Sequence, residues 1–196
     1  MSAEVVRASI ERSIEVHVRI IAECLAVIAA GADALVAACR AGHNFGNGWS
    51  AADAQHLAAE FVGRYVRQRD PMPALALNAN SSPVTATGND YGYDQVFAKQ
   101  LQAFAAPGDV AVAIGTSGNS PSAIEGVRYA RRLGLVTLAL TGASGGQLRG
   151  LADIPIAAPS DEAPRIQERH ILIGHSLCDA VDRAIAMDHF AIAPSN

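Results

Sequence analysis

The chain has 196 residues, of which 50% are hydrophobic and only 17% are charged, and its formal net charge at pH 7 is −4. This apolar content can offset the conformational entropy lost on folding, so a disordered chain is excluded. A negative net charge without a run of basic residues argues against binding to the phosphate backbone of a nucleic acid, so no nucleic-acid partner is expected. The low charged fraction is unusual for a monomer's surface and favours subunit contacts.

The N-terminal residues do not have the pattern of a targeting signal. Four charged residues interrupt the stretch that a signal peptide needs to be apolar, namely Glu4, Arg7, Glu11 and Arg12. No uninterrupted run of about 18 apolar residues is present, so no membrane-spanning segment is expected. The three cysteines are far apart and form no Cys-x-x-Cys pair, which argues against a disulfide framework. We therefore expect a cytoplasmic protein without a membrane partner.

The first predicted element is an amphipathic helix over residues 5–30. Its apolar residues recur at helical steps, and they are Ile10, Ile14, Ile21, Leu25 and Ile28. A second helical stretch, residues 32–40, follows Gly31. Two leading helices without a strand between them are expected to dock on a partner surface. Residues 1–41 are therefore interpreted as an N-terminal helical oligomerisation segment.

From residue 42 onward, short apolar strands alternate with helices. Strands are predicted at residues 74–77, 110–114, 136–140 and 154–157, with a weak first strand at 43–48 in which only Phe45 is a good strand former. Helices are predicted at residues 50–66, 93–104, 121–133, 145–151 and 164–187. This alternation indicates an α/β fold with a parallel sheet covered on both faces. No linker or repeat divides the chain, so residues 1–196 are interpreted as one domain.

Two strand-to-helix turns are rich in glycine and hydroxyl groups. The first spans residues 46–53, where Ser50 and Asp53 have the spacing of a capping box. The second spans residues 115–121, where Ser120 can cap a helix whose first residue is Pro121. Ligands bind at this edge of a doubly wound sheet, and the two turns together would offer amides, hydroxyls and helix dipoles to one phosphate. Either turn alone is explained by ordinary capping, whereas the pair favours a small phosphorylated molecule.

Two pairs of residues on predicted helices could hold a divalent metal ion. His56 and Glu60 are four residues apart and share a helix face, and Gln167 and His175 are eight residues apart on the last helix. Two imidazoles, a carboxylate and an amide oxygen make a possible four-ligand zinc site. Spacing alone favours a simpler interpretation, a surface His–Glu pair and a core histidine. The remaining histidines are interpreted as structural or solvated, and they are His17, His43, His170 and His189.

Residues 89–92 are predicted to form a loop between a strand and the helix at 93–104. A turn is enough to explain their Asn-Asp-Tyr-Gly sequence. Because this loop would reach the same face of the sheet, Asn89 and Asp90 are also candidates for contacts with substrate hydroxyls.

Taken in order, these motifs resemble those of the phosphoheptose isomerases, which belong to the sugar isomerase (SIS) domain group. The resemblance is carried by Gly46-Asn47-Gly48 with Ser50 to His56 and Glu60, by Gly88 to Gly92, by Thr116 to Ser120, and by Arg165 to Glu168 with His175. It covers essentially the whole chain. It implies a three-layer α/β/α sandwich with a five-stranded parallel sheet (the SIS fold) and N-terminal helices, assembled as a homotetramer with active sites at subunit interfaces.

The resemblance also implies a reaction, the conversion of sedoheptulose 7-phosphate to D-glycero-D-manno-heptose 7-phosphate. This is the first step towards nucleotide-activated heptose for cell-surface glycans such as lipopolysaccharide, and the substrate is a phosphorylated seven-carbon sugar. Carried over by motif, the substrate-binding residues are Asn47, Gly48, Trp49, Ser50, Glu60, Asn89, Asp90, Thr116, Ser117, Ser120 and Gln167. One zinc ion per subunit would be bound by His56, Glu60, Gln167 and His175.

Aldose–ketose isomerisation moves one proton between adjacent carbons through an enediol(ate) intermediate. It needs a base at carbon and an acid–base partner for the oxygens, and these are expected to be Glu60 and His175. The four hydroxyls of Ser50, Thr116, Ser117 and Ser120 are expected to hold the phosphate.

Two residues near the expected site depart from the family's pattern. Trp49 replaces a small residue, usually glycine, and Gly115 stands where serine is usual. An isomerase of another phosphosugar is therefore one alternative. A second is a non-catalytic SIS adaptor of the kind that binds the replication initiator DnaA, which is expected to lack Glu60 and His175. A third, a sugar-phosphate sensor, would need a DNA-binding appendage that the sequence does not show.

Overall fold

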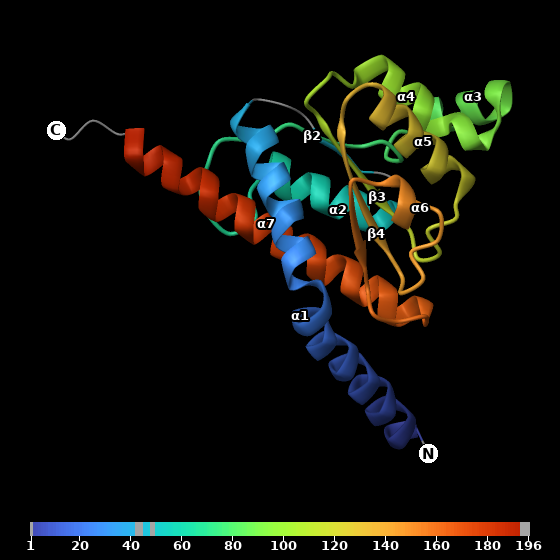
Figure 1. The fold of residues 1–196 in the computed structure, drawn as a ribbon, viewed down its shortest axis with the longest axis vertical. Helices are drawn as coiled ribbons and strands as arrows, with labels where there is room; N and C mark the ends of the chain where they lie inside the picture. Colours follow the sequence, from blue (N-terminus) through green and yellow to red (C-terminus); the bar gives the residue numbers. More distant parts are fainter. Residues whose placement is uncertain (1, 42–44, 48–49, 193–196) are drawn as a thin grey trace.

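The fold is built around a parallel β-sheet. The computed structural model describes residues 2–41, 45–47 and 50–192. The sheet has the order β2-β1-β3-β4-β5, and each neighbouring pair is parallel (Figure 1). The strands are β1 (Phe45–Asn47), β2 (Ala74–Ala76), β3 (Val110–Ile114), β4 (Val136–Thr141) and β5 (Ile154–Ala157). The predicted α/β fold with a parallel sheet is confirmed.

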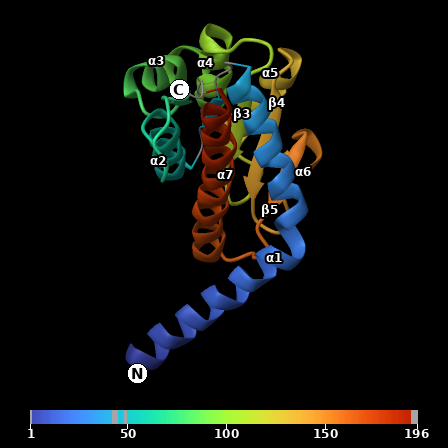
Figure 2. The same ribbon diagram turned by 90° about the vertical axis from the view of Figure 1, so that its left-hand side faces the viewer.

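Helices cover both faces of this sheet. Their bounds are α1 (Ser2–Arg40), α2 (Ala51–Val62), α3 (Ser81–Tyr91), the 3-10 turn η1 (Tyr93–Gln95), α4 (Val96–Phe104), α5 (Pro121–Arg132), α6 (Leu148–Leu151) and α7 (Ala163–Ile192). The helices α1, α2 and α7 lie on one side, and α4, α5 and α6 lie on the other (Figures 1 and 2). The two faces therefore have separate cores.

Strand β3 shows how one strand serves both cores. All of its residues are buried. Val110, Val112 and Ile114 belong to the core formed with α1, α2 and α7. Ala111 and Ala113 alternate with them and face α4 and α5 on the other side. A parallel strand buried on both faces is expected to be a continuous apolar run, as it is here.

The leading segment is one helix rather than two. α1 runs unbroken from Ser2 to Arg40, so the predicted division at Gly31 is wrong. Gly31 lies where α1 crosses the core, and a Cβ there would be 3.1 Å from Leu138 Cδ2 and 3.5 Å from Ile156 Cδ1. The glycine is used for close helix–sheet packing, which outweighs its poor helix propensity.

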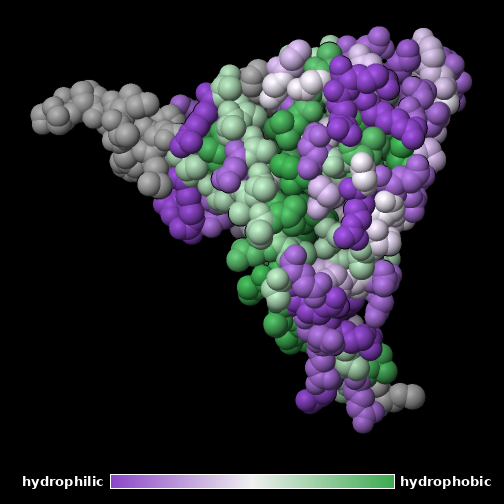
Figure 3. Space-filling view, in the orientation of Figure 1, coloured by the Kyte–Doolittle hydropathy of each residue, from purple (hydrophilic) through white to green (hydrophobic). Residues whose placement is uncertain are grey.

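The predicted apolar stripe of α1 is largely on the outside of the molecule. Ile10, Ile14, Ile21 and Leu25 are exposed, whereas Ile28 is buried. The N-terminal half of α1 projects away from the body, and hydrophobic residues follow one side of it (Figures 2 and 3). The stripe therefore faces solvent in the single chain instead of the core.

By length and composition alone, α1 is also long and apolar enough to cross a membrane. This finding rests on length and composition only, so the expectation that no segment spans a membrane stays a prediction. In the structure 33% of the stretch is buried, and core helices of globular proteins pass the same test. The C-terminal half of α1 packs against α7 and β5.

The predicted loop around residues 89–92 is wrong, because Ser81–Tyr91 form helix α3. Asn80 caps this helix by accepting the N–H of Ser82 at 3.1 Å, and Gly92, with φ of 92°, ends it. None of the α3 residues is buried. Without an apolar stripe, the helix gives no periodic signal in the sequence.

Candidate active site

The turns after β1 and β3 leave the same edge of the sheet. β1 and β3 are parallel neighbours in which Asn47 pairs with Val112, so their carboxyl ends point the same way. The first turn leads into α2 and the second into α5. The positive ends of two helix dipoles therefore lie at one edge, as a phosphate site requires.

Ser50 is the N-cap residue of α2, but its side chain does not cap the helix. Its hydroxyl donates to the Asp53 carboxylate instead, with 3.0 Å between Oγ and Oδ2. The predicted capping box is therefore wrong. A charged acceptor competes well for the hydroxyl proton, and the Ser50 hydroxyl accepts none of the first-turn N–H groups of α2.

Ser120 behaves in the same way at the start of α5. Pro121 occupies the first turn as predicted, but Ser120 makes no side-chain cap, and its Oγ lies 3.1 Å from Ser122 Oγ. In the same turn, Ser117 Oγ accepts the N–H of Asn119 at 3.2 Å. The half-buried hydroxyls of Ser50 and Ser120 thus both stand at helix N-termini, and within the described residues neither caps its helix.

The turn after β3 contacts the start of α6 and the glycines before it. The N–H of Leu148 donates to the carbonyl of Gly118 at 3.1 Å. Gly118 has φ of 64°, and a Cβ there would lie 2.0 Å from the Gly145 carbonyl oxygen, so only glycine allows this approach. Gly145 and Gly146 also have positive φ. The predicted helix at 145–151 is therefore wrong at its start, and α6 begins at Leu148.

His56, Glu60 and His175 meet where α2 packs against α7. His56 Nε2 lies 2.9 Å from His175 Nε2 and 3.4 Å from Glu60 Oε1. One potential ligand atom from each residue lies within 4.8 Å of the others. The interpretation of His175 as a core histidine is wrong, because it is half-buried and faces His56. We call these three residues the triad.

The donor chemistry of the triad fits a zinc ion. Each neutral imidazole has one nitrogen with a free lone pair, and a carboxylate only accepts. Two imidazoles and one carboxylate with a remaining open position are a common ligand set of catalytic zinc. The side chains of His56 and Glu60 are 47% and 23% exposed, so solvent and substrate can reach them.

The structure does not decide the role of Gln167. It lies on α7 with an exposed side chain, eight residues before His175. Eight residues of helix rise about 12 Å, so both side chains must extend toward each other to share one ion. Its place as a fourth ligand stays a prediction.

The predicted sugar contacts also stay predictions. Asn89 and Asp90 are exposed on α3, which packs against α4 and η1. The contacts found in the described part of the chain do not link them to the triad. Asn47 ends β1, while Gly48 and Trp49 lie outside the described residues.

Buried polar side chains at this edge were not predicted from the sequence. Asn78 follows β2 and Thr141 ends β4, and their side-chain polar atoms have no hydrogen-bond partner among the described residues. His170 on α7 places Nε2 3.2 Å from the Thr141 carbonyl oxygen. Burial lowers the pKa of His170, which favours the neutral ring. Asn78 follows Leu77 just beyond β2, and Thr141 follows Leu140 in β4. A polar residue at the carboxyl end of an apolar run is the sequence signal from which both could have been predicted.

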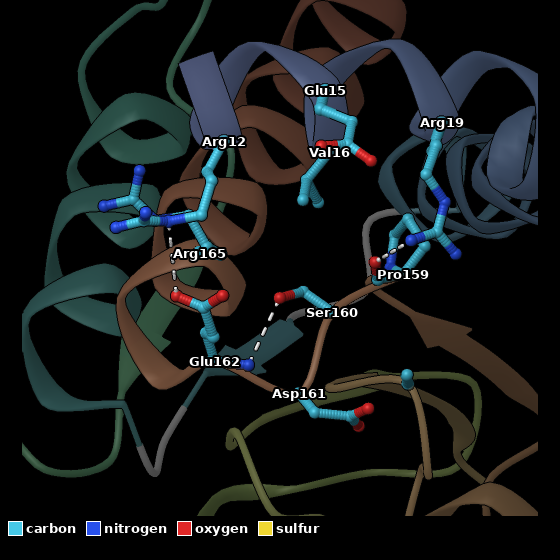
Figure 4. Close-up of a pocket in the computed structure, with 10 residues that line it drawn as sticks. Arg12, Glu15, Val16, Arg19, Pro159, Ser160, Asp161, Glu162 and Arg165 are labelled. Carbon is cyan, nitrogen blue, oxygen red and sulfur yellow. Dashed lines mark hydrogen bonds and ion pairs between the residues drawn. The ribbon is translucent and has the colours of Figure 1, made fainter. Parts of the chain in front are cut away.

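A separate pocket lies between α1 and the segment before α7 (Figure 4). Three arginines and three acidic residues line it, and they are Arg12, Arg19, Arg165, Glu15, Asp161 and Glu162. Arg19 donates to the Pro159 carbonyl at 2.9 Å, and Arg12 pairs with Glu162 at 4.0 Å. Because the opposite charges compensate one another, the pocket has no clear preference for an anion.

Known proteins match this chain over nearly its whole length. A family model for the SIS domain matches residues 9–142. A phosphoheptose isomerase of Rhodospirillum rubrum is 44% identical over 183 residues, covering 92% of this chain and 97% of the relative. One of Geobacter sp. is 44% identical over 185 residues, covering 93% and 96%. The solved structure of a phosphoheptose isomerase from Francisella tularensis gives a TM-score of 0.89 at 35% identity, covering 93% and 99%.

Sequence and architecture agree in these comparisons, since the same family is matched by a family model, by relatives and by a solved structure. The chain therefore belongs to the SIS domain family and, within it, to the phosphoheptose isomerases.

Proposed function

We propose that this protein is an aldose–ketose isomerase that converts sedoheptulose 7-phosphate to D-glycero-D-manno-heptose 7-phosphate. The observation that carries the proposal is the triad, in which two imidazoles and a carboxylate converge. It occurs in a chain that matches a phosphoheptose isomerase over 92% of its length. A non-catalytic adaptor is expected to lack Glu60 and His175, and both are present in this chain.

The sugar phosphate is proposed to bind at the turns after β1 and β3. Its partners would be the hydroxyls of Ser50, Thr116, Ser117 and Ser120 and the N–H groups at the starts of α2 and α5. The support is that neither Ser50 nor Ser120 uses its hydroxyl as a helix cap. Hydroxyls and amides can hold a phosphate on an acidic protein without a basic surface.

Glu60 is proposed as the base that removes the proton from carbon. It is the one carboxylate of the triad and lies beside His56. His175 is proposed as the acid–base partner, because an imidazole can donate from one nitrogen and accept at the other. Together they would move the proton through an enediol(ate) intermediate, whose negative charge must be stabilised.

Zinc is the proposed cofactor, with one ion per subunit held by His56, Glu60, Gln167 and His175. When bound, it would polarise the substrate carbonyl and stabilise negative charge. Glu60 would serve as both ligand and base, which its two carboxylate oxygens permit. The support is the donor set of the three triad residues.

A cytoplasmic homotetramer with active sites at subunit interfaces is the proposed working form. The support is the exposed apolar stripe of α1, which the single chain leaves uncovered. The product would enter the synthesis of nucleotide-activated heptose for cell-surface glycans.

Incubation with sedoheptulose 7-phosphate, followed by NMR analysis of the product, tests the proposed reaction. We expect the zinc-loaded protein to form the aldose, a chelator to stop turnover, and added zinc to restore it. Absence of aldose product from the zinc-loaded protein would contradict the proposal and favour an adaptor or another phosphosugar as substrate.

Metal analysis of His56→Ala tests the ligand assignment separately. We expect zinc affinity to fall by at least about 10-fold, because even residues behind metal ligands change affinity by that much. His17→Ala is the control, since His17 is an exposed histidine on α1. Unchanged zinc occupancy in His56→Ala would contradict the assignment.

A further inference from the structure

A buried ion pair lies at the end of α2, outside the triad. Arg69 Nε and Asp182 Oδ1 are 2.7 Å apart, and each side chain is only 1% exposed. Burying two charges is costly unless further hydrogen bonds satisfy both groups. The partners of this pair therefore indicate what it holds in place.

Arg69 caps the C-terminal end of α2. Its Nη2 donates to the Glu60 carbonyl at 2.8 Å, and its Nη1 donates to the Phe61 carbonyl at 2.9 Å. The last carbonyls of a helix have no intrahelical donor, so the guanidinium replaces the missing bonds. Arg69 is thus bonded to the backbone of the helix that carries His56 and Glu60.

Asp182 connects the C-terminal end of α2 to α7. Its Oδ2 accepts the N–H groups of Val66 at 3.1 Å and Arg67 at 2.7 Å, in the segment after α2. Asp182 lies seven residues after His175 on α7, which places the two residues on the same side of that helix. One carboxylate therefore fixes the end of α2 to α7 two turns from His175.

We propose that the Arg69–Asp182 pair is a positioning device that sets the distance between His56 and Glu60 on α2 and His175 on α7. The inference rests on the proposed function of the triad as a metal and catalytic site. Arg69 contacts Glu60 only through its backbone carbonyl. The pair therefore acts through the helices and not on the substrate.

The hydrogen bonds of the pair require an arginine at position 69 and an aspartate at position 182. Metal–ligand distances vary by only about 0.2 Å, so a small slide of α2 along α7 would separate the ligands. The planar guanidinium reaches Asp182, Glu60 and Phe61 at once, whereas a lysine ammonium is a point donor on a flexible stem. Asp182→Asn keeps the size but removes the charge.

Arg69→Lys and Asp182→Asn test the device at 25 °C in the full-length protein. For both variants we expect the zinc Kd to rise about 10- to 100-fold, and kcat to fall with KM for sedoheptulose 7-phosphate nearly unchanged. We also expect the visible spectrum of the Co²⁺-loaded protein to change, because it reports ligand geometry. A role confined to fold stability would leave that spectrum unchanged.

Asp109→Asn is the matched control. Asp109 is 3% exposed and accepts the N–H of Ala106 at 2.9 Å, but it precedes β3 at the opposite edge of the sheet. We expect this variant to lower Tm without changing zinc Kd or the Co²⁺ spectrum.

Two results would overturn the inference, and they are distinguishable. If Arg69→Lys and Asp182→Asn lower Tm but keep the zinc Kd and the Co²⁺ spectrum, the device is wrong and the proposed function stands. If the unmodified protein neither binds zinc nor forms the aldose, the proposed function fails and this inference fails with it. Should either variant not fold, the other gives the same decision, because Arg69→Lys keeps the charge of the pair and Asp182→Asn keeps its size.

Discussion

At the scale of single residues, several polar groups leave ordinary hydrogen bonds unmade at one edge of the sheet. Ser50 and Ser120 begin helices without capping them, and the buried side-chain polar atoms of Asn78 and Thr141 have no hydrogen-bond partner in the part of the chain that the structure describes. A serine cap stabilises a helix by about 1 kcal/mol, so this arrangement gives up stability. Hydroxyls and amides that helix capping leaves unused are groups that the proposed sugar phosphate would bind.

Gly115→Ser is expected to strengthen substrate binding. A Cβ at Gly115 meets no atom of the described residues within 4 Å, so a serine side chain fits among them, and its hydroxyl would add a donor at the turn proposed to bind the phosphate. One hydrogen bond of about 1 kcal/mol would lower KM about 5-fold at unchanged kcat. Steady-state kinetics of Gly115→Ser against Gly115→Ala, which adds only the methyl group, check this. Equal KM values for the two variants would contradict the placement of the phosphate.

Glu60→Gln is expected to abolish isomerisation while leaving the fold intact. The amide cannot accept the carbon-bound proton, so kcat should fall on the order of 10²- to 10⁴-fold. The Glu60 side chain is partly exposed and pairs with His56 at the surface, so Tm should stay within about 2 °C. Product analysis and circular dichroism measure the two effects. Substantial retained turnover would remove Glu60 from the role of base.

Asp182 is expected to make stability depend on acid pH. Burial opposes ionisation, but the N–H groups of Arg67 and Val66 and the Arg69 guanidinium outweigh it and hold the pKa of Asp182 below its ordinary value. This stabilisation is complete above the unfolded pKa of about 3.9 and is lost as pH falls through the lower folded value. Tm should therefore drop more steeply below about pH 4 in the native protein than in Asp182→Asn. Parallel Tm curves would contradict this.

At the scale of elements, the contact between α2 and α7 decides the geometry of the triad. Gly174 precedes His175, and Leu57 follows His56, and these two neighbours touch where the helices cross. A Cβ on Gly174 would lie 2.6 Å from Leu57 Cδ2 and 3.2 Å from its Cγ. Leu57 belongs to the buried core, so it has little room to yield.

Gly174→Ala is expected to push α2 away from α7. Overpacking a core contact costs about 1–3 kcal/mol, and the separation of His56 from His175 should weaken zinc binding. Gly150→Ala is the control, because nothing lies within 4 Å of its Cβ and it is expected to be neutral or slightly stabilising. Thermal unfolding and zinc titration measure both effects. Unchanged zinc Kd in Gly174→Ala would show that the helix spacing does not control the triad.

At the scale of the whole molecule, contacts within a single chain do not account for the exposed apolar residues of α1. Its C-terminal half belongs to the core, but its N-terminal half leaves the body with apolar residues exposed (Figures 1 and 3). An exposed apolar stripe of this length indicates an interface. In the proposed homotetramer, this stripe is the surface that subunit contacts would cover.

Ile21→Glu is expected to weaken the proposed tetramer. Ile21 is 69% exposed on the apolar stripe, and a buried charge without a partner at an interface is strongly unfavourable. Ala30→Glu is the control, since it lies nine residues later on the opposite side of the helix and is also exposed. Light scattering after size exclusion gives the mass of each variant. An unchanged mass for Ile21→Glu would place the interface elsewhere.

Local patterns in the sequence were enough to predict the alternating strands, the parallel sheet and the two turns. Val110–Ile114 is an apolar run that favours a buried strand wherever it occurs, and Pro121 favours a helix start whatever surrounds it. The family resemblance depended on the same kind of information, because its motifs are short and contiguous. What the sequence could not predict reliably were features such as α3, which has no apolar stripe.

Only the tertiary structure decided which distant residues meet. His56 and His175 are 119 positions apart and Arg69 and Asp182 are 113 apart, so no local pattern records either contact. The unbroken course of α1 through Gly31 likewise depends on Leu138 and Ile156, which lie far along the chain. Local propensities differ by about 1 kcal/mol, and packing and buried hydrogen bonds between distant segments outweigh them. The sequence by itself therefore determined the elements and the motif residues, and the packing of α2 on α7 brought the triad together.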